Sequence, residues 1–218
     1  MSEVKLIAYT QSKEIAGITS QDIMAYCARV SNPSNQNNSE TAEKLLNYCV
    51  RNKHWSVFEM CNVVLEINTT RDIARQILRH RSFHFQEFSQ RYADPNELGF
   101  ETREFRLQDA KNRQNSIEVD EDNEMTKSWK IKQDQLIHET KLAYKWAIEN
   151  GIAKEQARAV LPEGLTMSRM YMNGTVRDWI HYCQLRMGNG TQKEHRIIAA
   201  DCWTILCNLY PFLKKIEN

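Results

Sequence analysis

Apolar and polar residues alternate in some parts of the chain and recur every three to four positions in others. Alternation is typical of half-buried strands, and it predicts strands at residues 4–10, 57–68 and 165–172. The longer period is typical of amphipathic helices. It predicts helices at residues 20–30, 40–52, 71–79, 125–150, 153–160, 175–187 and 192–211. We therefore expect an α+β fold in which an antiparallel sheet is flanked by helices.

Residues at the ends of these segments support the helix assignments. Ser20, Ser39, Thr70 and Thr175 each lie where a helix is expected to begin, and a hydroxyl there can accept a backbone N–H. Gly151 is expected to end the long helix, because glycine readily adopts the left-handed conformation at a helix C-terminus. In the helix that Thr175 opens, the residues expected to face the core are Val176, Trp179, Ile180 and Cys183.

The segment from residue 71 to 92, RDIARQILRHRSFHFQEFSQRY, concentrates positive charge. Its only acidic residues are Asp72 and Glu87, whereas five positions carry a guanidinium: Arg71, Arg75, Arg79, Arg81 and Arg91. Its first part predicts a helix that ends near His80, and residues 82–92 predict an extended segment with one break of register. Neighbouring guanidiniums repel one another, and an anionic ligand at the helix–strand junction would offset that repulsion.

Three interpretations fit this segment. The arginines could pair with acidic residues elsewhere on a solvated surface, or bind nucleic-acid phosphates while phenylalanines stack on bases. They could instead hold a nucleotide or a phosphorylated cofactor. Only this third interpretation uses the nearby groups that can hydrogen-bond a polar heterocycle, namely Gln76, His80, Gln86, Glu87 and Ser89. A net charge of +1, from 29 basic and 28 acidic residues, counts against the nucleic-acid interpretation, because polyanion binders usually carry a basic excess.

Length and composition indicate one domain that covers residues 1–218. A chain of 218 residues can bury a sizeable core, and 41% hydrophobic residues give no reason to expect disorder. No apolar run approaches the roughly 20 residues of a membrane span, and the N-terminus lacks the features of a signal peptide. We expect a cytoplasmic protein that binds neither a membrane nor nucleic acid.

The six cysteines show neither disulfide nor metal-binding spacing. None forms a CxxC pair and most lie in apolar surroundings, which predicts buried thiols in a reducing compartment, with a catalytic thiol as the alternative. The histidines lack HxxxH and Cys/His zinc spacing, so we expect no metal site.

Arg177 and Arg186 lie nine residues apart on one predicted helix. At about 100° per residue they project from opposite sides of that helix. One rigid pocket would not easily use both arginines, whereas a site built between subunits would. We therefore expect an oligomer.

Arg79-His80-Arg81, followed after seven residues by Ser89, resembles the RHR-x7-S signature of the flavin-dependent thymidylate synthases. Further pieces of the family pattern occur in family order between about residues 20 and 200. They are ARVS at 28–31, His54-x-Ser56 with Glu59, Ala157-Arg158 before Leu161-Pro162, TVR at 175–177, Leu185-Arg186 and NGTQKEH at 189–195. Many relatives carry other residues at the positions of Met60, His84, Gln86, Thr175 and His181, and we expect altered ligand contacts there.

The resemblance implies a homotetramer with active sites between subunits. The implied reaction converts dUMP, 5,10-methylenetetrahydrofolate and NADPH to dTMP, tetrahydrofolate and NADP, with bound FAD. Arg186 is implied as the catalytic residue, a fixed cation that stabilises the N3-ionised uracil. The implied dUMP ligands are Gln76, Arg79, Glu87, Ser89, Arg91, Arg158 and Arg186. The implied FAD ligands are Ser31, His54, Ser56, Arg79, His80, Arg81, Arg177 and His181.

Cysteine is not expected to act as a nucleophile, because nothing in this chain resembles the Pro-Cys-His site of the other thymidylate synthase family. Ser89 is expected to bind rather than to attack, since no His/Asp relay adjoins it.

Two rival classes of function stay open on the residues alone. A single-stranded nucleic-acid-binding module would use the arginines and phenylalanines of residues 71–92, and it predicts salt-sensitive oligonucleotide binding without a flavin. A structural or interaction protein predicts neither oligonucleotide binding nor flavin binding. Neither rival gives a role to the outlying pieces of the family pattern.

Overall fold

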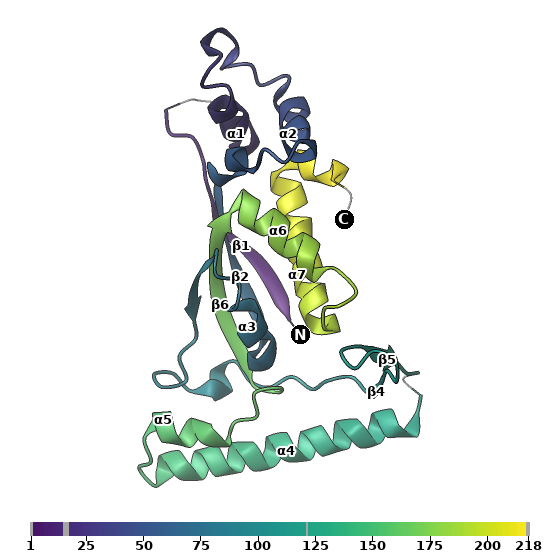
Figure 1. Ribbon diagram of the computed structural model, residues 1–218. Coiled ribbons are helices and arrows are strands. Elements are labelled where there is room, and N and C mark those ends of the chain that lie inside the picture. Colours follow the sequence, from purple (N-terminus) through teal and green to yellow (C-terminus); the bar gives the residue numbers. More distant parts are fainter. Residues whose placement is uncertain (1, 15–17, 121, 217–218) are drawn as a thin grey trace. The chain divides into compact units, whose positions relative to one another are not determined.

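The computed structural model describes residues 2–14, 18–120 and 122–216. The strands in this part of the chain are β1 (Glu3–Tyr9), β2 (Asn62–Thr70), β3 (His84–Glu87), β4 (Arg106–Gln108), β5 (Ser116–Glu118) and β6 (Met167–Thr175). Its α-helices are α1 (Ser20–Ala28), α2 (Ala42–Arg51), α3 (Arg71–Ile77), α4 (Glu124–Glu149), α5 (Lys154–Ala157), α6 (Val176–Arg186) and α7 (Lys193–Leu209) (Figure 1). The predicted α+β fold is confirmed.

These elements divide between two units whose segments interleave along the chain. The first unit consists mainly of Asn68–Arg79 and Glu87–Met170, and the second of Glu3–Ile67, His80–Gln86 and Tyr171–Asn218. The division does not test whether residues 1–218 act as one domain, and that stays a prediction.

The sheet of the second unit has the strand order β1-β2-β6-β3, and β2 and β6 each continue past the limits of this unit. Backbone hydrogen bonds fix the relative direction of β2 and β6. The Val176 N–H donates to the Cys61 carbonyl (2.9 Å), and the Arg71 N–H donates to the Thr166 carbonyl (3.0 Å). Residue numbers therefore rise along one strand as they fall along the other, which confirms the predicted antiparallel pairing.

Strand β3 brings residues 80–86 against helix α6. A Cβ atom added at Gly174 of β6 would lie 2.5 Å from the ring of Phe83, so no larger residue fits this position without a shift of that ring. The Phe83 ring packs on Trp179 with 4.8 Å between ring centroids, and on Tyr182 at 5.8 Å. The middle of the arginine-rich segment is thus fixed to the face of α6.

Helices α6 and α7 cover one face of this sheet (Figure 1). Helix α6 starts with a capping box, because the Thr175 hydroxyl accepts the Asp178 N–H (3.2 Å) and the Asp178 carboxylate accepts the Thr175 N–H (2.9 Å). The cap at Thr175 is confirmed. So is the core face of this helix, all of whose predicted members are buried: Val176, Trp179, Ile180 and Cys183.

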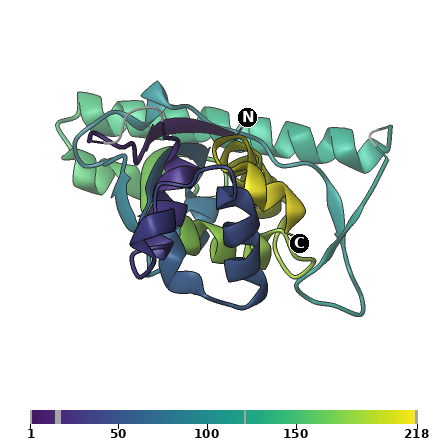
Figure 2. The same cartoon turned by 90° about the horizontal axis from the view of Figure 1, so that it is seen from above.

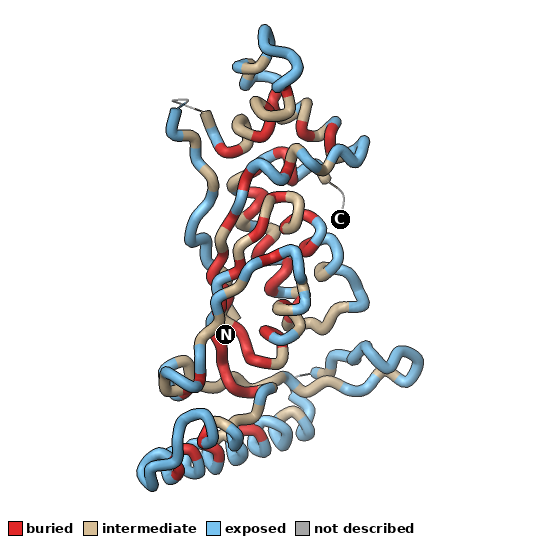
Figure 3. The backbone as a smooth tube through the Cα atoms, turned by 60° about the vertical axis from the view of Figure 1, so that its left-hand side comes forward, coloured by how far each residue is buried: buried red, intermediate tan, exposed pale blue. Residues whose placement is uncertain are grey.

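Helix α4 is the longest element of the first unit, and α5 runs alongside it (Figures 1 and 2). Tyr144, Ala147 and Ala157 are buried together between these two helices. Gly151 has φ +76° after the end of α4, as predicted for a helix-ending glycine. Most of the remaining surface of α4 is exposed, whereas buried residues concentrate along β2, β6 and α6 (Figure 3).

Several predicted boundaries are wrong. The strand predicted at residues 57–68 begins only at Asn62, because the preceding residues form a short 3-10 helix, η2 (Trp55–Glu59). Thr19, rather than Ser20, caps α1, in a capping box with Asp22. The residue that precedes α2 is Thr41, so Ser39 is not its cap.

One further expectation for the chain needs correction. The extended conformation predicted for residues 82–92 is a strand only over β3, and residues 93–116, which carry no clear period, contribute β4 to a hairpin with β5. Within the residues that the structure describes, no helix is long and apolar enough to cross a membrane.

Candidate functional site

The arginine-rich segment is shared between the units, with residues 71–79 and 87–92 in the first and 80–86 in the second. Three of its guanidiniums pair with carboxylates, as the solvated-surface interpretation predicts: Arg71 with Glu87 (3.6 Å), Arg75 with Glu163 (3.0 Å) and Arg91 with Glu155 (3.2 Å). Arg71 is also buried. These three arginines therefore have carboxylate partners within the protein.

Arg79 and Arg81 differ from the other three arginines. Both are exposed, and within the described residues of its own unit neither forms an ion pair with a carboxylate. An exposed guanidinium without an acidic partner has its full set of donors available for an anion.

Three cations of the first unit contact residues Tyr92 and Glu155. Arg91 Nη2 lies 3.2 Å from a carboxylate oxygen of Glu155, and Arg158 Nε donates to the Glu155 backbone carbonyl (3.3 Å). Lys154 Nζ donates to the carbonyl of Tyr92 (2.9 Å). The structure thus brings the two sequence-predicted residues Arg91 and Arg158 together, and it adds Lys154 as a third cation.

Glu87 is held from two sides. Ser168 Oγ donates to Glu87 Oε1 (2.8 Å), and the guanidinium of Arg71 lies 3.6 Å from the same oxygen. Gln76 on α3 is half-buried, whereas Ser89 is exposed and its carbonyl accepts the backbone N–H groups of the turn that follows. Glu87 is therefore fixed in position, while the side chain of Ser89 is accessible.

In the second unit, η2 and α6 bring together residues far apart in the sequence. Arg177 forms an ion pair with Glu59, and the His181 ring packs edge-on against Trp55 with 4.7 Å between centroids. The loss of water around this ring lowers the pKa of His181, and the Arg177 guanidinium lowers it further, against an opposing effect of Asp178. His181 therefore favours its neutral form.

A second cluster in this unit contains Arg186. Its Nε donates to Nε2 of His80 at 2.8 Å, and the His80 ring packs edge-on against Tyr182 (4.9 Å between centroids). The Tyr182 hydroxyl is hydrogen-bonded to Nε2 of His195 (3.1 Å). Arg177 and Arg186 thus contact different partners, consistent with the prediction that they project from opposite sides of α6.

The other predicted site residues of the second unit lie on its surface. Ser31, His54, Ser56 and Arg81 are exposed, and the His54 ring packs against Tyr48 at 5.9 Å. No contact within the described residues joins these four side chains to one another. The structure therefore leaves their convergence as a prediction.

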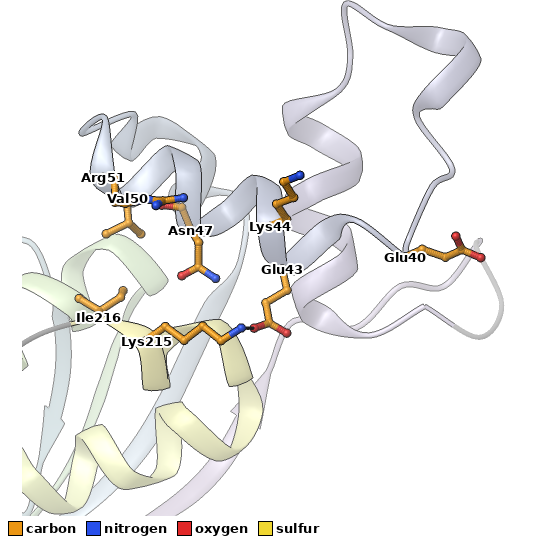
Figure 4. A pocket seen from close by; sticks show the side chains of 8 residues that line it. All are labelled: Glu40, Glu43, Lys44, Asn47, Val50, Arg51, Lys215 and Ile216. Atoms are coloured by element: carbon orange, nitrogen blue, oxygen red, sulfur yellow. Dashed lines mark hydrogen bonds and ion pairs between the residues drawn. The ribbon is translucent and has the colours of Figure 1, made fainter.

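A cavity of about 780 Å³ lies beside α2 in the same unit (Figure 4). Its wall carries charges of both signs, and Lys215 pairs with Glu43 at 2.6 Å. None of the site residues predicted from the sequence lines this cavity, which is formed by Glu40, Glu43, Lys44, Asn47, Val50, Arg51, Lys215 and Ile216. The predicted site is consequently not this cavity.

The thiols do not have the environment of a nucleophile. Five of the six free cysteines are buried, and burial raises the pKa of the Cys61 thiol to about 11 and that of Cys202 well above its ordinary value. These groups stay protonated at neutral pH, as expected for structural thiols. Among the residues that the structure describes, no three His, Cys, Asp or Glu side chains are grouped to hold a metal ion.

Sequence reasoning gave no role to Lys154, Glu155, Tyr182 or His195. The position of Lys154 and Glu155 just before Arg158 could have drawn attention to them, and His195 ends one of the recognised family pieces. Tyr182 carries no such signal, because it occupies a core position of α6.

Comparison with known proteins gives a consistent result. Residues 5–212 match the family described as "Thymidylate synthase complementing protein". The chain is 48% identical over 211 residues to the probable flavin-dependent thymidylate synthase of Paramecium bursaria Chlorella virus 1, covering 97% of this chain and 96% of the relative. It is 46% identical over 213 residues to the flavin-dependent thymidylate synthase of Synechocystis sp., covering 96% of each.

Among solved structures, the chain resembles a UMP/dUMP methylase, PolB from Streptomyces cacaoi, bound with 5-Br UMP. The TM-score is 0.82, and the match covers 98% of this chain and 92% of the other. The identity of 22% limits this likeness to the fold.

Proposed function

We propose that the two units of this chain, which belongs to the flavin-dependent thymidylate synthase family, carry separate sets of ligand-binding residues. The enzyme converts dUMP, 5,10-methylenetetrahydrofolate and NADPH to dTMP, tetrahydrofolate and NADP, with FAD as its cofactor. Apart from Arg186, the residues proposed for dUMP belong to the first unit, and apart from Arg79, those proposed for FAD belong to the second.

The first-unit set suits a nucleoside monophosphate. Arg91 lies against the Glu155 carboxylate, and Arg158 donates to the backbone carbonyl of the same residue. A dianionic phosphate that replaced the carboxylate would gain the Arg91 donors, and Arg158 would reach it by turning away from that carbonyl. Ser89 would contribute a hydroxyl. Arg79 would approach the nucleotide as an unpaired cation, and Gln76 and Glu87 offer the amide and carboxylate that read a uracil edge.

The donor set of the second unit fits FAD. A diphosphate needs cations, and Arg81 is exposed with no carboxylate partner among the described residues of this unit. Arg177 supplies a second guanidinium, while Ser31 and Ser56 supply hydroxyls and His54, His80 and His181 supply imidazoles. Bound FAD supplies the hydride that reduces the transferred one-carbon group.

Arg186 is the proposed catalytic residue. Its Nε is engaged by His80, which directs the guanidinium plane, and its two terminal nitrogens make no hydrogen bond within the described residues of the second unit. A guanidinium is charged at any working pH, so these nitrogens can stabilise the negative charge of an N3-ionised uracil without a proton transfer. The uracil becomes nucleophilic at C5 without an enzyme thiol.

The assembly and location of the protein are further proposals. We propose a homotetramer with active sites between subunits, one domain over residues 1–218, and a cytoplasmic location. Exposure of Arg79, Arg81 and Arg91 supports sites completed by another copy of the chain, because phosphate-binding arginines are more effective when partly removed from water.

The observation that carries the proposal is the full-length family match that contains the Arg79-His80-Arg81 motif. The test is formation of dTMP from dUMP, 5,10-methylenetetrahydrofolate and NADPH by the FAD-loaded protein. UMP in place of dUMP measures the demand for a 2′-deoxyribose. Absence of dTMP from a folded, flavin-loaded protein would contradict the proposal.

A further inference from the structure

Tyr182 and His195 form a buried polar pair in the second unit for which the proposed mechanism has no use so far. Their side chains are 2% and 0% exposed, and the Tyr182 hydroxyl is 3.1 Å from His195 Nε2. Buried polar pairs of this kind hold their side chains in one arrangement, since breaking the hydrogen bond would leave polar groups in an apolar interior.

The pair is connected to Arg186 through one ring. Arg186 Nε always donates, so Nε2 of His80 must accept and the His80 ring carries its proton on Nδ1. This ring packs edge-on against Tyr182, with centroids 4.9 Å apart and an interplanar angle of 85°. Its centroid is 6.4 Å from that of His195. Rotation of the Tyr182 ring would remove this edge-on contact with the ring that accepts from Arg186.

The charges around the pair favour neutral groups. Burial lowers the pKa of His195 to about 3, with further contributions from Arg186 and His80. A neutral His195 keeps one ring nitrogen able to accept from the Tyr182 hydroxyl, whose own pKa is raised by burial well above its ordinary value. The hydrogen bond therefore persists across the physiological pH range.

We propose that Tyr182 and His195 are positioning residues, whose hydrogen bond holds the His80 ring where it accepts from Arg186 and so directs the Arg186 guanidinium. The inference rests on the proposed function, in which this guanidinium faces the uracil. Neither residue touches substrate or cofactor in this account, and both act through His80.

The test compares two tyrosines that each lose one buried hydroxyl. Tyr182→Phe removes the bond to His195, and Tyr210→Phe removes a bond of similar length and burial to Ser20 (2.9 Å) in the same unit. Misdirection of a catalytic group by about 1 Å costs up to roughly 100-fold in rate. We expect Tyr182→Phe to lower kcat by roughly 10- to 100-fold at an unchanged KM for dUMP, and Tyr210→Phe to keep both constants near the wild-type values.

A conservative substitution separates positioning from packing. His195→Gln can still bond the Tyr182 hydroxyl and should keep most of kcat, whereas His195→Leu should lose as much as Tyr182→Phe. The double variant Tyr182→Phe/His195→Leu should lose much less than the product of the two single losses, because both substitutions remove the same hydrogen bond. Equal losses in His195→Gln and His195→Leu would overturn the inference.

A crystal structure of Tyr182→Phe gives a readout that does not depend on turnover. The inference expects the 2.8 Å contact between Arg186 Nε and His80 Nε2 to be lost in this variant and kept in Tyr210→Phe. If the wild-type protein makes no dTMP, the proposed function fails. If it makes dTMP and the two Phe variants behave alike, the function stands and the positioning role of Tyr182 and His195 is refuted.

Discussion

The Arg91–Glu155 pair predicts opposite effects from two substitutions in the same contact. Both side chains are largely exposed, at 65% and 50%, so their ion pair is worth only roughly 0.2–1 kcal/mol. A charge-assisted hydrogen bond from Arg91 to the dUMP phosphate is worth roughly 1.5–3 kcal/mol. Arg91→Ala should therefore raise the Kd for dUMP by roughly 10- to 150-fold.

Glu155→Gln should act in the other direction. Without the carboxylate, Arg91 no longer has to leave a partner when dUMP binds, which should lower the Kd by roughly 1.4- to 5-fold. Isothermal titration of the flavin-loaded protein with dUMP measures both effects. The matched control is Glu163→Gln, which breaks a pair of similar length and exposure with Arg75 in the same unit, and it should leave the Kd unchanged. An unchanged Kd in Arg91→Ala, or weaker binding in Glu155→Gln, would refute the phosphate assignment.

Three other predictions concern catalysis, pH and the thiols. Arg186→Ala should retain FAD yet form no dTMP, and wild-type turnover in this variant would remove it from the catalytic role. Burial lowers the pKa of His195 in the folded protein to about 3, below the ordinary value of 6.5. Between these two values the unfolded chain binds a proton that the folded protein does not. The free energy of unfolding should therefore fall by about 1.4 kcal/mol per pH unit as the pH drops from about 6.5 toward 3. Urea unfolding at several pH values should show a weaker pH dependence of the unfolding free energy in His195→Gln. The control variant His138→Gln, at an exposed position, should keep the wild-type pH dependence. Single Cys→Ala variants should keep turnover, and complete loss in one that is folded and flavin-loaded would indicate a thiol mechanism.

Local signals made much of the fold predictable. Helix α6 follows directly from Thr175, Asp178 and the apolar spacing behind them, and α4 ends at the glycine that its sequence offers. The predicted start of β2 was wrong because Val57 and Phe58 are residue types that are common in strands. They belong instead to a 3-10 helix that precedes the alternating residues. At α1, the Thr19–Asp22 capping box was a better local signal than Ser20.

The pairing of the site residues could not be predicted in the same way. Arg91 and Glu155 are 64 positions apart. Arg71 follows β2 and Glu87 ends β3, and these residues meet because both strands pair with β6. The family signature points to the residues proposed to bind ligands, because the chemistry of the reaction restricts which residue types can serve there. It did not indicate Tyr182, whose role depends on a contact between α6, α7 and residues 80–86.

The proposed function requires a flavoenzyme whose flavin chemistry is coupled to dUMP. It is tested most directly by anaerobic absorption spectra of the purified protein with FAD, recorded as NADPH is added with and without dUMP. We expect bands of bound oxidised flavin that bleach with NADPH, and that bleach faster when dUMP is present. A protein that binds no FAD, or a flavin whose reduction does not respond to dUMP, would contradict it.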